Sequence, residues 1–351
     1  MLQIKWLKYE LKFRLPAGTS RGILKSKDTY FLKVFDDAIP TVFGIGECNL
    51  FRGLSFDDRP EYESILNKLS QQPYFYVRNL HQALLEWPSI RFGLEMAFID
   101  FIREGKCSFF STKFMQGEDG IPINGLIWMG EKSFMKEQIR EKIEQGFTCL
   151  KLKIGAIDFA EELDLLKAIR KEFTNDLLEL RVDANGAFKP EDALEKLDVL
   201  SEFQIHSIEQ PIRAGQIEEM ASLCSKTPLP IALDEELIGV HKLEEKAKLL
   251  DIIRPQYIII KPSLLGGYSA SEEWVKLSDD RNIEWWITSA LESNIGLNAI
   301  AQWTYSLNSK MYQGLGTGQL FTNNLSSPLQ IKDAKLWHME ENKWELNSLK
   351  F

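Results

Sequence analysis

Charged side chains recur at even intervals through the middle of this 351-residue sequence. Each follows a short apolar stretch, and successive members are 30, 26, 25 and 27 residues apart: Lys153, Asp183, Glu209, Asp234 and Lys261. One strand, one helix and two loops account for a step of that length. The spacing predicts that these side chains end successive parallel strands, whose carboxyl ends meet at one mouth of a βα barrel.

Three of these side chains are carboxylates: Asp183, Glu209 and Asp234. Packed at one mouth without a cation, they would repel one another. All-oxygen ligands favour a hard ion, and a site with few protein ligands favours Mg²⁺ over Ca²⁺, with Mn²⁺ as the alternative. A second interpretation is that the acids form ion pairs with neighbours such as Arg181 and bind no metal.

Two lysines, Lys151 and Lys153, interrupt the apolar segment CLKLKIG. In an extended chain both point to one face and the leucines to the other, as in a solvated edge strand. At a barrel mouth, two ammonium groups about 7 Å apart repel by about 2 kcal/mol at an effective dielectric near 20, which favours release of one proton. Lys153 could then act as a general base, with Lys261 on the opposite side of the substrate. This arrangement predicts removal of a proton α to a carboxylate, with the metal stabilising the enolate.

The N-terminal third predicts a separate α+β domain, residues 1–118. Three strands, separated by the turn-like stretches PAGTSRG and DDAIP, form an antiparallel meander: IKWLKYELKF, TYFLKVF and TVFGIGE. Helical patterns follow in residues 58–105, and Gly105 supplies a helix stop. The boundary is expected near residue 118, in QGEDG.

After this boundary, short apolar strands alternate with helices that have one polar face. Eight strand candidates occupy about 200 residues, which predicts a closed βα barrel over residues 119–321. The candidates are NGLIW, CLKLKI, ELRVDA, IHSIEQ, PIALDE, YIIIKP, EWWITSA and MYQGLG. Residues 322–351 are expected to pack back on the N-terminal domain.

Composition and charge limit the classes of function. Apolar residues at 44% and charged residues at 26% are typical of a soluble globular enzyme, and a net charge of −9 argues against a nucleic-acid partner. The four cysteines lie far apart without a CxxC pair, which predicts reduced thiols and a cytoplasmic location. No stretch is long enough to span a bilayer, so no membrane partner is expected. A small-molecule carboxylate is the expected substrate, and homo-oligomerisation stays open.

Six motifs resemble the enolase superfamily, specifically its muconate-lactonizing-like branch with a KxK motif on the second barrel strand. They are K-L-K at 151–153, V-D-A-N at 182–185, I-E-Q-P at 208–211, L-D-E at 233–235, I-K-P at 260–262 and S-A-L-E-S at 289–293. G-I-G-E-C at 44–48 is similar to a loop of the family's capping domain. The resemblance therefore covers nearly the whole chain.

The resemblance implies a modified TIM barrel, (β/α)7β, with an N-terminal α+β capping domain. A lysine or histidine base working with Mg²⁺ is the general pattern of this superfamily. Asp183, Glu209 and Asp234 would then be the metal ligands. Lys153 and Lys261 would act from opposite sides of the substrate, with Lys151 orienting Lys153 and lowering its pKa.

Within the branch, S-A-L-E-S and G-L-G-T-G-Q-L-F at 314–321 look most like the dehydratases of menaquinone biosynthesis, which convert a cyclohexadiene carboxylate to an aromatic product. Relatives with the same catalytic residues racemise N-succinylamino acids, epimerise dipeptides or cycloisomerise muconate. Dipeptide epimerases carry an aspartate-rich motif where this chain has glycines, which favours a substrate without a free amine. A Schiff-base aldolase and a non-catalytic binding barrel are the interpretations from other classes.

Substrate-binding residues are expected at three places. Ser289 and Glu292 follow the seventh barrel strand and are expected to line the pocket. Gly314 and Gly316 either offer backbone N–H groups to a carboxylate or form a tight turn. Arg21, in the loop between the first two strands, either reaches over the mouth to a substrate carboxylate or is an ordinary surface charge.

Histidines are expected to take no part in the site. None of the four falls at the end of a barrel strand in the mouth: His81, His206, His241 and His338. By strand parity, His206 is expected to face the surrounding helices.

Overall fold

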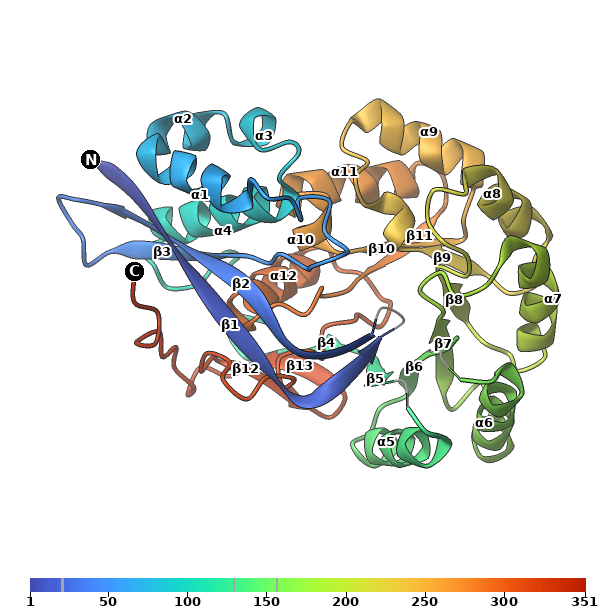
Figure 1. Cartoon of the computed structure of the whole chain (residues 1–351). Helices are drawn as coiled ribbons and strands as arrows, with labels where there is room; N and C mark the ends of the chain where they lie inside the picture. Colours follow the sequence, from blue (N-terminus) through green and yellow to red (C-terminus); the bar gives the residue numbers. More distant parts are fainter. Residues whose placement is uncertain (20–21, 129, 156) are drawn as a thin grey trace.

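The computed structural model describes residues 1–19, 22–128, 130–155 and 157–351. An antiparallel sheet with helices over it lies beside a curved parallel sheet that has helices on its outer side (Figure 1). This is the predicted fold class, a modified TIM barrel with an N-terminal α+β domain.

The antiparallel sheet is the predicted meander, in the order β1-β2-β3. Its strands are β1 (Leu2–Thr19), β2 (Gly22–Asp36) and β3 (Phe43–Cys48). The pairing of β1 with β2 shifts register between Lys12 and Ala17 and then continues to Thr19 and Gly22. The described residues of PAGTSRG, 16–19 and 22, therefore belong to the two strands, and the other two residues of the predicted turn lie outside the described residues.

Four helices follow this meander in the chain and complete the N-terminal domain. They are α1 (Tyr62–Gln71), α2 (Pro73–Arg78), α3 (Leu80–Ala83) and α4 (Pro88–Ile102). Helix α4 is buried on most of its circumference. It ends just before Gly105, whose φ of +69° is readily adopted by glycine, as predicted for the helix stop.

Glycines allow β3 to lie directly against α4. A Cβ on Gly44 would lie 2.1 Å from the Ala97 carbonyl oxygen, and one on Gly46 would lie 1.9 Å from the Gly93 carbonyl oxygen. The G-I-G-E-C stretch is thus a buried strand and not the loop that the resemblance implied.

Seven parallel strands form the wall of the barrel, in the order β11-β10-β9-β8-β7-β6-β5. They are β5 (Gly125–Ile127), β6 (Cys149–Lys153), β7 (Glu179–Asp183), β8 (Ser207–Glu209), β9 (Ile231–Leu233), β10 (Tyr257–Ile260) and β11 (Glu284–Ile287). All seven coincide with predicted segments.

Two residues of the eighth predicted strand close the barrel. Gln313 forms a parallel bridge to Ile123, and Gly314 forms one to Thr288. The Gln313 N–H donates to the Pro122 carbonyl at 2.9 Å, and the Gly314 N–H donates to the Ile287 carbonyl at 2.8 Å. This segment therefore joins β11 to the chain that enters β5, although it is too short to form a strand of its own.

Helices connect the barrel strands and cover the outside of the barrel (Figure 1). They are α5 (Lys132–Glu144), α6 (Phe159–Glu172), α7 (Pro190–Ser201), α8 (Ile217–Lys226), α9 (Leu243–Ile253), α10 (Pro262–Leu265), α11 (Gly267–Asp279) and α12 (Asn294–Ser306). In the part of the chain that the structure describes, no helix has the length and apolar character to cross a membrane.

The C-terminal segment forms a small antiparallel sheet in the order β12-β13-β4. It contains β12 (Leu329–Lys332), β13 (Lys335–His338) and β4 (Ile121–Pro122). Nearby, Asn323 contacts β1: its carbonyl accepts from the Tyr9 hydroxyl at 2.9 Å. The division of the chain at residues 118 and 321 stays a prediction.

Candidate active site

The two lysines of CLKLKIG lie on an interior strand. β6 has β5 on one side and β7 on the other, so the edge-strand interpretation is wrong. Lys151 is buried and the Lys153 side chain is 12% exposed. Both point into the barrel because their neighbours Leu150 and Leu152 pack in the hydrophobic core on the other face.

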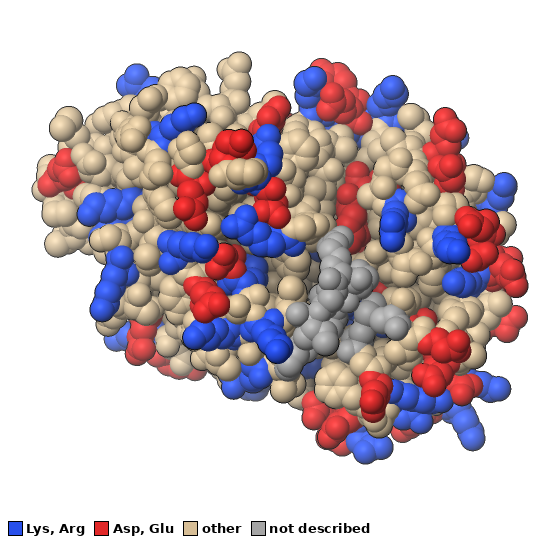
Figure 2. Space-filling view, in the orientation of Figure 1, with Lys and Arg blue, Asp and Glu red and all other residues tan. Residues whose placement is uncertain are grey.

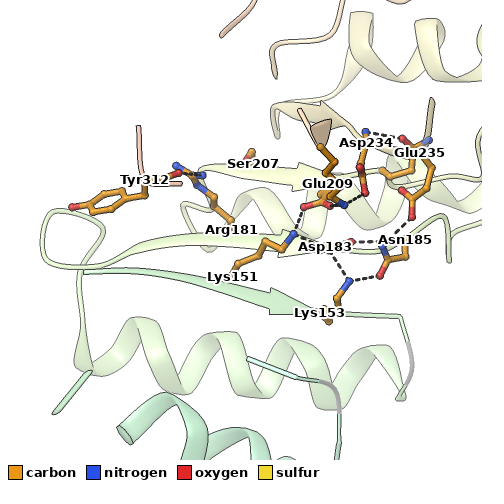
Figure 3. Close-up of polar contacts among 12 residues, drawn as sticks. Lys151, Lys153, Arg181, Asp183, Asn185, Ser207, Glu209, Asp234, Glu235 and Tyr312 are labelled. Carbon is orange, nitrogen blue, oxygen red and sulfur yellow. Dashed lines mark hydrogen bonds and ion pairs between the residues drawn. The ribbon is translucent and has the colours of Figure 1, made fainter. Parts of the chain in front are cut away.

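The three predicted carboxylates come from adjacent positions around the barrel. Lys153 pairs in register with Asp183, and Asp183 pairs with Glu209, so successive strands bring them to the same level. Asp234 follows β9 directly. Figure 3 shows these groups together near the ends of the strands, whereas Arg181 and Tyr312 lie toward the strand starts.

Each of three ammonium groups contacts a carboxylate of this cluster. The Lys151 nitrogen bridges Asp183, at 3.0 Å, and Glu209. Lys153 lies 2.8 Å from the same Asp183 oxygen. Lys261 bridges Asp234 and Glu209, 3.5 Å from the latter. The structure therefore brings together all six residues that were predicted for catalysis and metal binding.

Burial makes the ionisation of this cluster depend on its internal pairing. Burial opposes the charged form of Asp183, but Lys151 and Lys153 outweigh it and hold the pKa of Asp183 well below its ordinary value. Burial, with the charge of Asp183 added, raises the pKa of Glu209, and burial also raises that of Asp234.

The lysine pKa values also reflect this pairing. Burial opposes the charged form of Lys151, but Asp183 and Glu209 outweigh it and raise the pKa of Lys151. Asp234 and Glu209 likewise overcome burial and raise the pKa of Lys261 well above its ordinary value. The carboxylates thus stabilise positive charge, which is what a cation site requires.

Arg181 does not serve as the counter-ion of these acids. Its guanidinium pairs with Glu179 at 2.7 Å and donates to the Tyr312 carbonyl at 3.0 Å. It also stacks 4.3 Å from the Trp286 ring centroid. The interpretation in which Arg181 neutralises the carboxylates is therefore wrong.

The donor set fits a hard divalent cation. Asp183, Glu209 and Asp234 offer only oxygen donors and are at most 3% exposed. In the described ranges, no three His, Cys, Asp or Glu side chains are already arranged around one ion position. The nitrogens of Lys151 and Lys261 bridge the carboxylates in this arrangement.

Asn185 belongs to the site and was not predicted. Its side-chain oxygen accepts from Lys153 at 2.6 Å, and its amide donates to Glu235 at 3.1 Å. Its φ of +44° turns it back toward the acid two residues earlier, and its backbone N–H donates to Asp183 at 3.1 Å. The only signal in the sequence was its place in V-D-A-N, since a neutral amide does not belong to the regular series of charged residues.

A cavity opens directly above the charged cluster. Its polar floor includes Lys151, Lys153, Asp183, Asp234 and Lys261. Much of its wall is formed by apolar side chains: Phe51, Leu54, Leu126, Trp128 and Leu291. The N-terminal domain contributes the first two of these. The cavity thus combines charge at its base with apolar walls, as expected for a small organic anion.

Most of the predicted substrate-binding residues line this cavity. Ser289, Gly314 and Gly316 do so, and the Ser289 hydroxyl is hydrogen-bonded to Thr317. The Gly314 N–H is used in barrel closure, which leaves it unavailable to a carboxylate. Arg21 lies outside the described residues.

Glu292 has a different position. Its carboxylate accepts from Asn49 at 3.1 Å and from Ser263, and its side chain is fully buried. Glu292 is not one of the described residues that line the cavity. Leu291, with a φ of +60°, interrupts the strand-like alternation, so parity counted from β11 does not carry past it.

The histidines lie away from the cavity in the part of the chain that is described. His206 does not face the helices, however, and that expectation is wrong. Its ring lies 4.8 Å from the Tyr257 ring and 6.3 Å from the Trp286 ring, at the strand starts. His206 precedes β8, so it is not bound by the alternation of that strand.

A parallel barrel with paired acids and lysines at the strand ends defines a barrel enzyme whose site lies beneath a second domain. The chain belongs to the enolase superfamily: a family model described as Enolase C-terminal domain-like matches residues 134–340. The o-succinylbenzoate synthase of Desulfotalea psychrophila is 47% identical over 370 aligned residues, covering 95% of this chain and 98% of that protein.

Solved structures agree with this assignment. The crystal structure of MenC from Desulfotalea psychrophila superposes with a TM-score of 0.85 at 43% identity, covering 96% of this chain and 99% of that one. A dipeptide epimerase from Enterococcus faecalis, complexed with Mg and L-Leu-L-Tyr, has a TM-score of 0.82 at 19% identity, with 97% of each chain covered. The second comparison shows that the fold is shared.

Proposed function

We propose that this chain is a Mg²⁺-dependent carbon–oxygen lyase of menaquinone biosynthesis. It would form o-succinylbenzoate by dehydrating 2-succinyl-6-hydroxy-2,4-cyclohexadiene-1-carboxylate. The observation that carries the proposal is the pair Lys153 and Lys261, which end opposite strands with three carboxylates between them. The 47% identity to an o-succinylbenzoate synthase over nearly the full length supports this choice of substrate.

The positions of the two lysines follow from the strand order. β6 and β10 are four places apart through β7, β8 and β9, and four places apart the other way through β5, the Gln313–Gly314 segment and β11. In a barrel of eight positions this separation is a diameter. A flat substrate above the carboxylates would therefore have one lysine on each face.

The proposed reaction needs one base and one stabilising cation. Lys153 removes the proton from the ring carbon α to the carboxylate. The bond from the ring to its hydroxyl then breaks, and the proton on Lys153 leaves with that oxygen as water. The ring gains its third double bond and becomes aromatic, while the Lys261 ammonium stabilises the negative charge that develops in between.

Asp183, Glu209 and Asp234 would hold the Mg²⁺ ion. When bound, the ion would stabilise the negative charge that the substrate carboxylate gains as the neighbouring C–H bond is broken. Lys151, fixed between Asp183 and Glu209, would keep Lys153 in its proper orientation by sharing the same Asp183 oxygen.

Racemisation of N-succinylamino acids is the second candidate, because it begins with the same proton transfer. An N-succinylamino acid racemase from Thermus thermophilus is 25% identical over 84% of this chain and 79% of that protein.

We also propose a cytoplasmic location. All four cysteines of this chain are free and buried, which supports this location.

The test compares both reactions in the wild-type protein and in Lys153→Ala. Dehydration is followed by loss of the cyclohexadiene absorbance, and racemisation by deuterium exchange at the α-carbon of N-succinyl amino acids in D₂O. Removing the base should lower kcat for dehydration by at least about 10³-fold. Lys153→Ala also removes one counter-charge of the buried Asp183, so its unfolding midpoint should fall, but its far-UV circular dichroism should stay that of a folded protein.

Lys171→Ala is the matched control, because Lys171 is an exposed lysine on α6. It should leave both reactions unchanged. Racemisation faster than dehydration in the wild type would favour the second candidate. Trapping of a carbonyl substrate by borohydride, with full activity in EDTA, would favour a Schiff-base aldolase instead.

A further inference from the structure

A buried set of polar side chains joins the N-terminal domain to the barrel beside the cavity. We call it the interdomain cluster: Lys27, Thr29, Glu47, Asn49, Ser263, Glu292 and Ser293. Every member is at most 9% exposed. The first four belong to β2, β3 and the residue just after β3, and the other three belong to the barrel. Burying so many polar groups is costly unless each is well paired.

Glu47 forms the first half of the cluster. One of its carboxylate oxygens accepts from the Ser293 N–H at 2.9 Å and the Thr29 hydroxyl at 2.8 Å. The other accepts from the Ser293 hydroxyl at 2.6 Å and the Gly296 N–H at 2.9 Å. A carboxylate from one domain therefore caps the N-terminus of α12 in the other, where the helix dipole favours negative charge.

Asn49 forms the second half of the cluster. Its side-chain oxygen accepts from the Lys27 ammonium. Its amide donates to the Ala290 carbonyl at 2.9 Å and to Glu292 at 3.1 Å. Glu292 in turn accepts from the Ser263 hydroxyl. One side chain of the N-terminal domain thus contacts the loop after β11 directly and, through Glu292, connects to α10.

These contacts lead directly to the walls of the cavity. Ala290 and Leu291 line it, and Leu291 has a φ of +60°, which a residue with a β-carbon adopts only when its surroundings impose it. Phe51, two residues after Asn49, lines the part of the cavity wall that the N-terminal domain contributes. Ser263 lies two residues after Lys261.

We propose that the interdomain cluster is a positioning device for the reaction, in which Asn49 holds the Ala290–Leu291 wall and the Phe51 wall at a fixed separation. Lys27 acts through Asn49, since it contacts the Asn49 side-chain oxygen and is absent from the described cavity lining. The choice of substrate in the test rests on the proposed function, but the positioning role does not.

The test uses Asn49→Leu, Lys27→Met and the double variant in the full-length protein. Asn49→Leu removes both donated hydrogen bonds at similar volume. It should raise KM for the cyclohexadiene carboxylate about tenfold and change kcat by less than about threefold, because the lysines and acids stay in place. Lys27→Met should have a similar effect. The double variant should be no worse than either single one, since both act through one amide.

Ser269→Ala is the matched control. It breaks a different contact between the domains, the 2.8 Å hydrogen bond from Arg91 on α4 to Ser269 on α11. It should leave KM unchanged.

Hydrogen–deuterium exchange gives a readout that does not depend on the substrate. Amide exchange in residues 290–293 should become faster in Asn49→Leu and in Lys27→Met, but not in Ser269→Ala. If Asn49→Leu does not fold, Asn49→Asp replaces it, because it also loses both donated hydrogen bonds. Unchanged KM and unchanged exchange in a folded Asn49 variant would overturn the proposal. Absence of turnover in the wild type would count against the proposed function alone.

Discussion

At the residue scale, the site is organised by carboxylates that each contact two lysines. Asp183 accepts both Lys151 and Lys153, and Glu209 accepts both Lys151 and Lys261. Repulsion between the two lysines of K-L-K, considered alone, favours loss of a proton. In the folded protein, Asp183 contacts both nitrogens and offsets this repulsion. The spacing of the two lysines along the strand does not reveal this contact.

Replacing Lys151 by Met should therefore destabilise the protein. It leaves Asp183 and Glu209 buried with one fewer counter-charge, which should cost about 3–5 kcal/mol of unfolding free energy in the presence of a chelator. A cation bound by the same acids would supply the missing charge. Saturating Mg²⁺ should recover about half of this loss or more, as measured by urea unfolding.

Lys246→Met provides the control for this comparison. Lys246 is also fully buried, but its ammonium pairs with Glu273 at 2.7 Å and with the Ala270 carbonyl at 3.0 Å. Its loss should destabilise the protein without any recovery in Mg²⁺. Equal Mg²⁺ effects on both variants would contradict metal binding by the three carboxylates.

The charged residues of the site could be predicted from the sequence because strand periodicity places them. Lys151 shares the inward face of β6 with Lys153, and the other five lie at the end of a buried strand or directly after it, where the register of a parallel barrel brings them together. Asn185 and Glu292 could not be placed in this way. Both depend on left-handed backbone, at Asn185 itself and at Leu291 before Glu292, and such local turns leave no periodic signal.

At the element scale, the contact between β3 and α4 shows how glycine sets the distance between a strand and a helix. Gly44 and Gly46 alternate with Ile45, so this face of β3 has no side chain before Cys48 and lies against the backbone of α4. This contact holds the strand that carries Glu47 and leads to Asn49. The sequence indicated a strand here, but its motif was assigned to a loop.

Gly46→Ala should therefore be strongly destabilising. Its Cβ would lie 1.9 Å from the Gly93 carbonyl oxygen and 2.8 Å from the Ala97 nitrogen, and both are backbone atoms that no side-chain rotation can move. Separating the helix from the strand should cost at least about 3 kcal/mol of unfolding free energy. Urea unfolding followed by tryptophan fluorescence measures the change.

Gly316→Ala is the matched substitution for stability. A Cβ at Gly316 would meet its nearest neighbour, Ile123, at 3.6 Å, which is ordinary contact. Its unfolding free energy should stay within about 0.5 kcal/mol of the wild type. Similar losses in both variants would show that the β3–α4 contact tolerates a side chain.

The eighth barrel strand illustrates a limit of prediction at the same scale. MYQGLG has the composition of a strand and lies at the correct place, yet only Gln313 and Gly314 form bridges. A Cβ at Gly314 would lie 2.4 Å from the Thr288 hydroxyl oxygen, so glycine is required where this segment meets the end of β11. Composition predicted the closure but not that two residues alone of this segment would form bridges.

At the scale of the whole molecule, the distribution of surface charge bears on the kind of partner that the protein binds. Figure 2 shows groups of both signs interspersed over the face that it presents. This agrees with the net charge of −9 and with a partner that enters a cavity rather than one that covers a surface. The walls of that cavity come from both domains, so their packing bears on substrate binding.

Buried acids of the N-terminal domain should make the stability of the whole protein depend on pH. Asp57 lies in the segment of the chain that connects β3 to α1, and it is fully buried. One of its oxygens accepts from the Ser89 N–H at 2.9 Å and the Ser89 hydroxyl at 2.7 Å. Burial outweighs these hydrogen bonds and raises the pKa of Asp57 from 3.8 to about 6. The folded protein therefore holds this proton more tightly than the unfolded chain does.

The sign of the pH effect follows from this difference in proton affinity. Stability from the protonated Asp57 is fully present below the unfolded pKa of 3.8 and is lost as pH rises through the folded pKa of about 6. A shift of about two pKa units corresponds to about 3 kcal/mol. Asp100, whose pKa burial also raises to about 6, contributes in the same direction.

Asp57→Asn isolates one of these two contributions. The amide stays neutral at every pH and keeps an oxygen for Ser89, so the variant should lose stability less steeply than the wild type as pH rises. Urea unfolding at pH 4, 5, 6 and 7 should show the wild-type stability falling, relative to that of the variant, by about 3 kcal/mol across this range. Parallel pH profiles for the two proteins would mean that Asp57 ionises equally readily in the folded and unfolded chain.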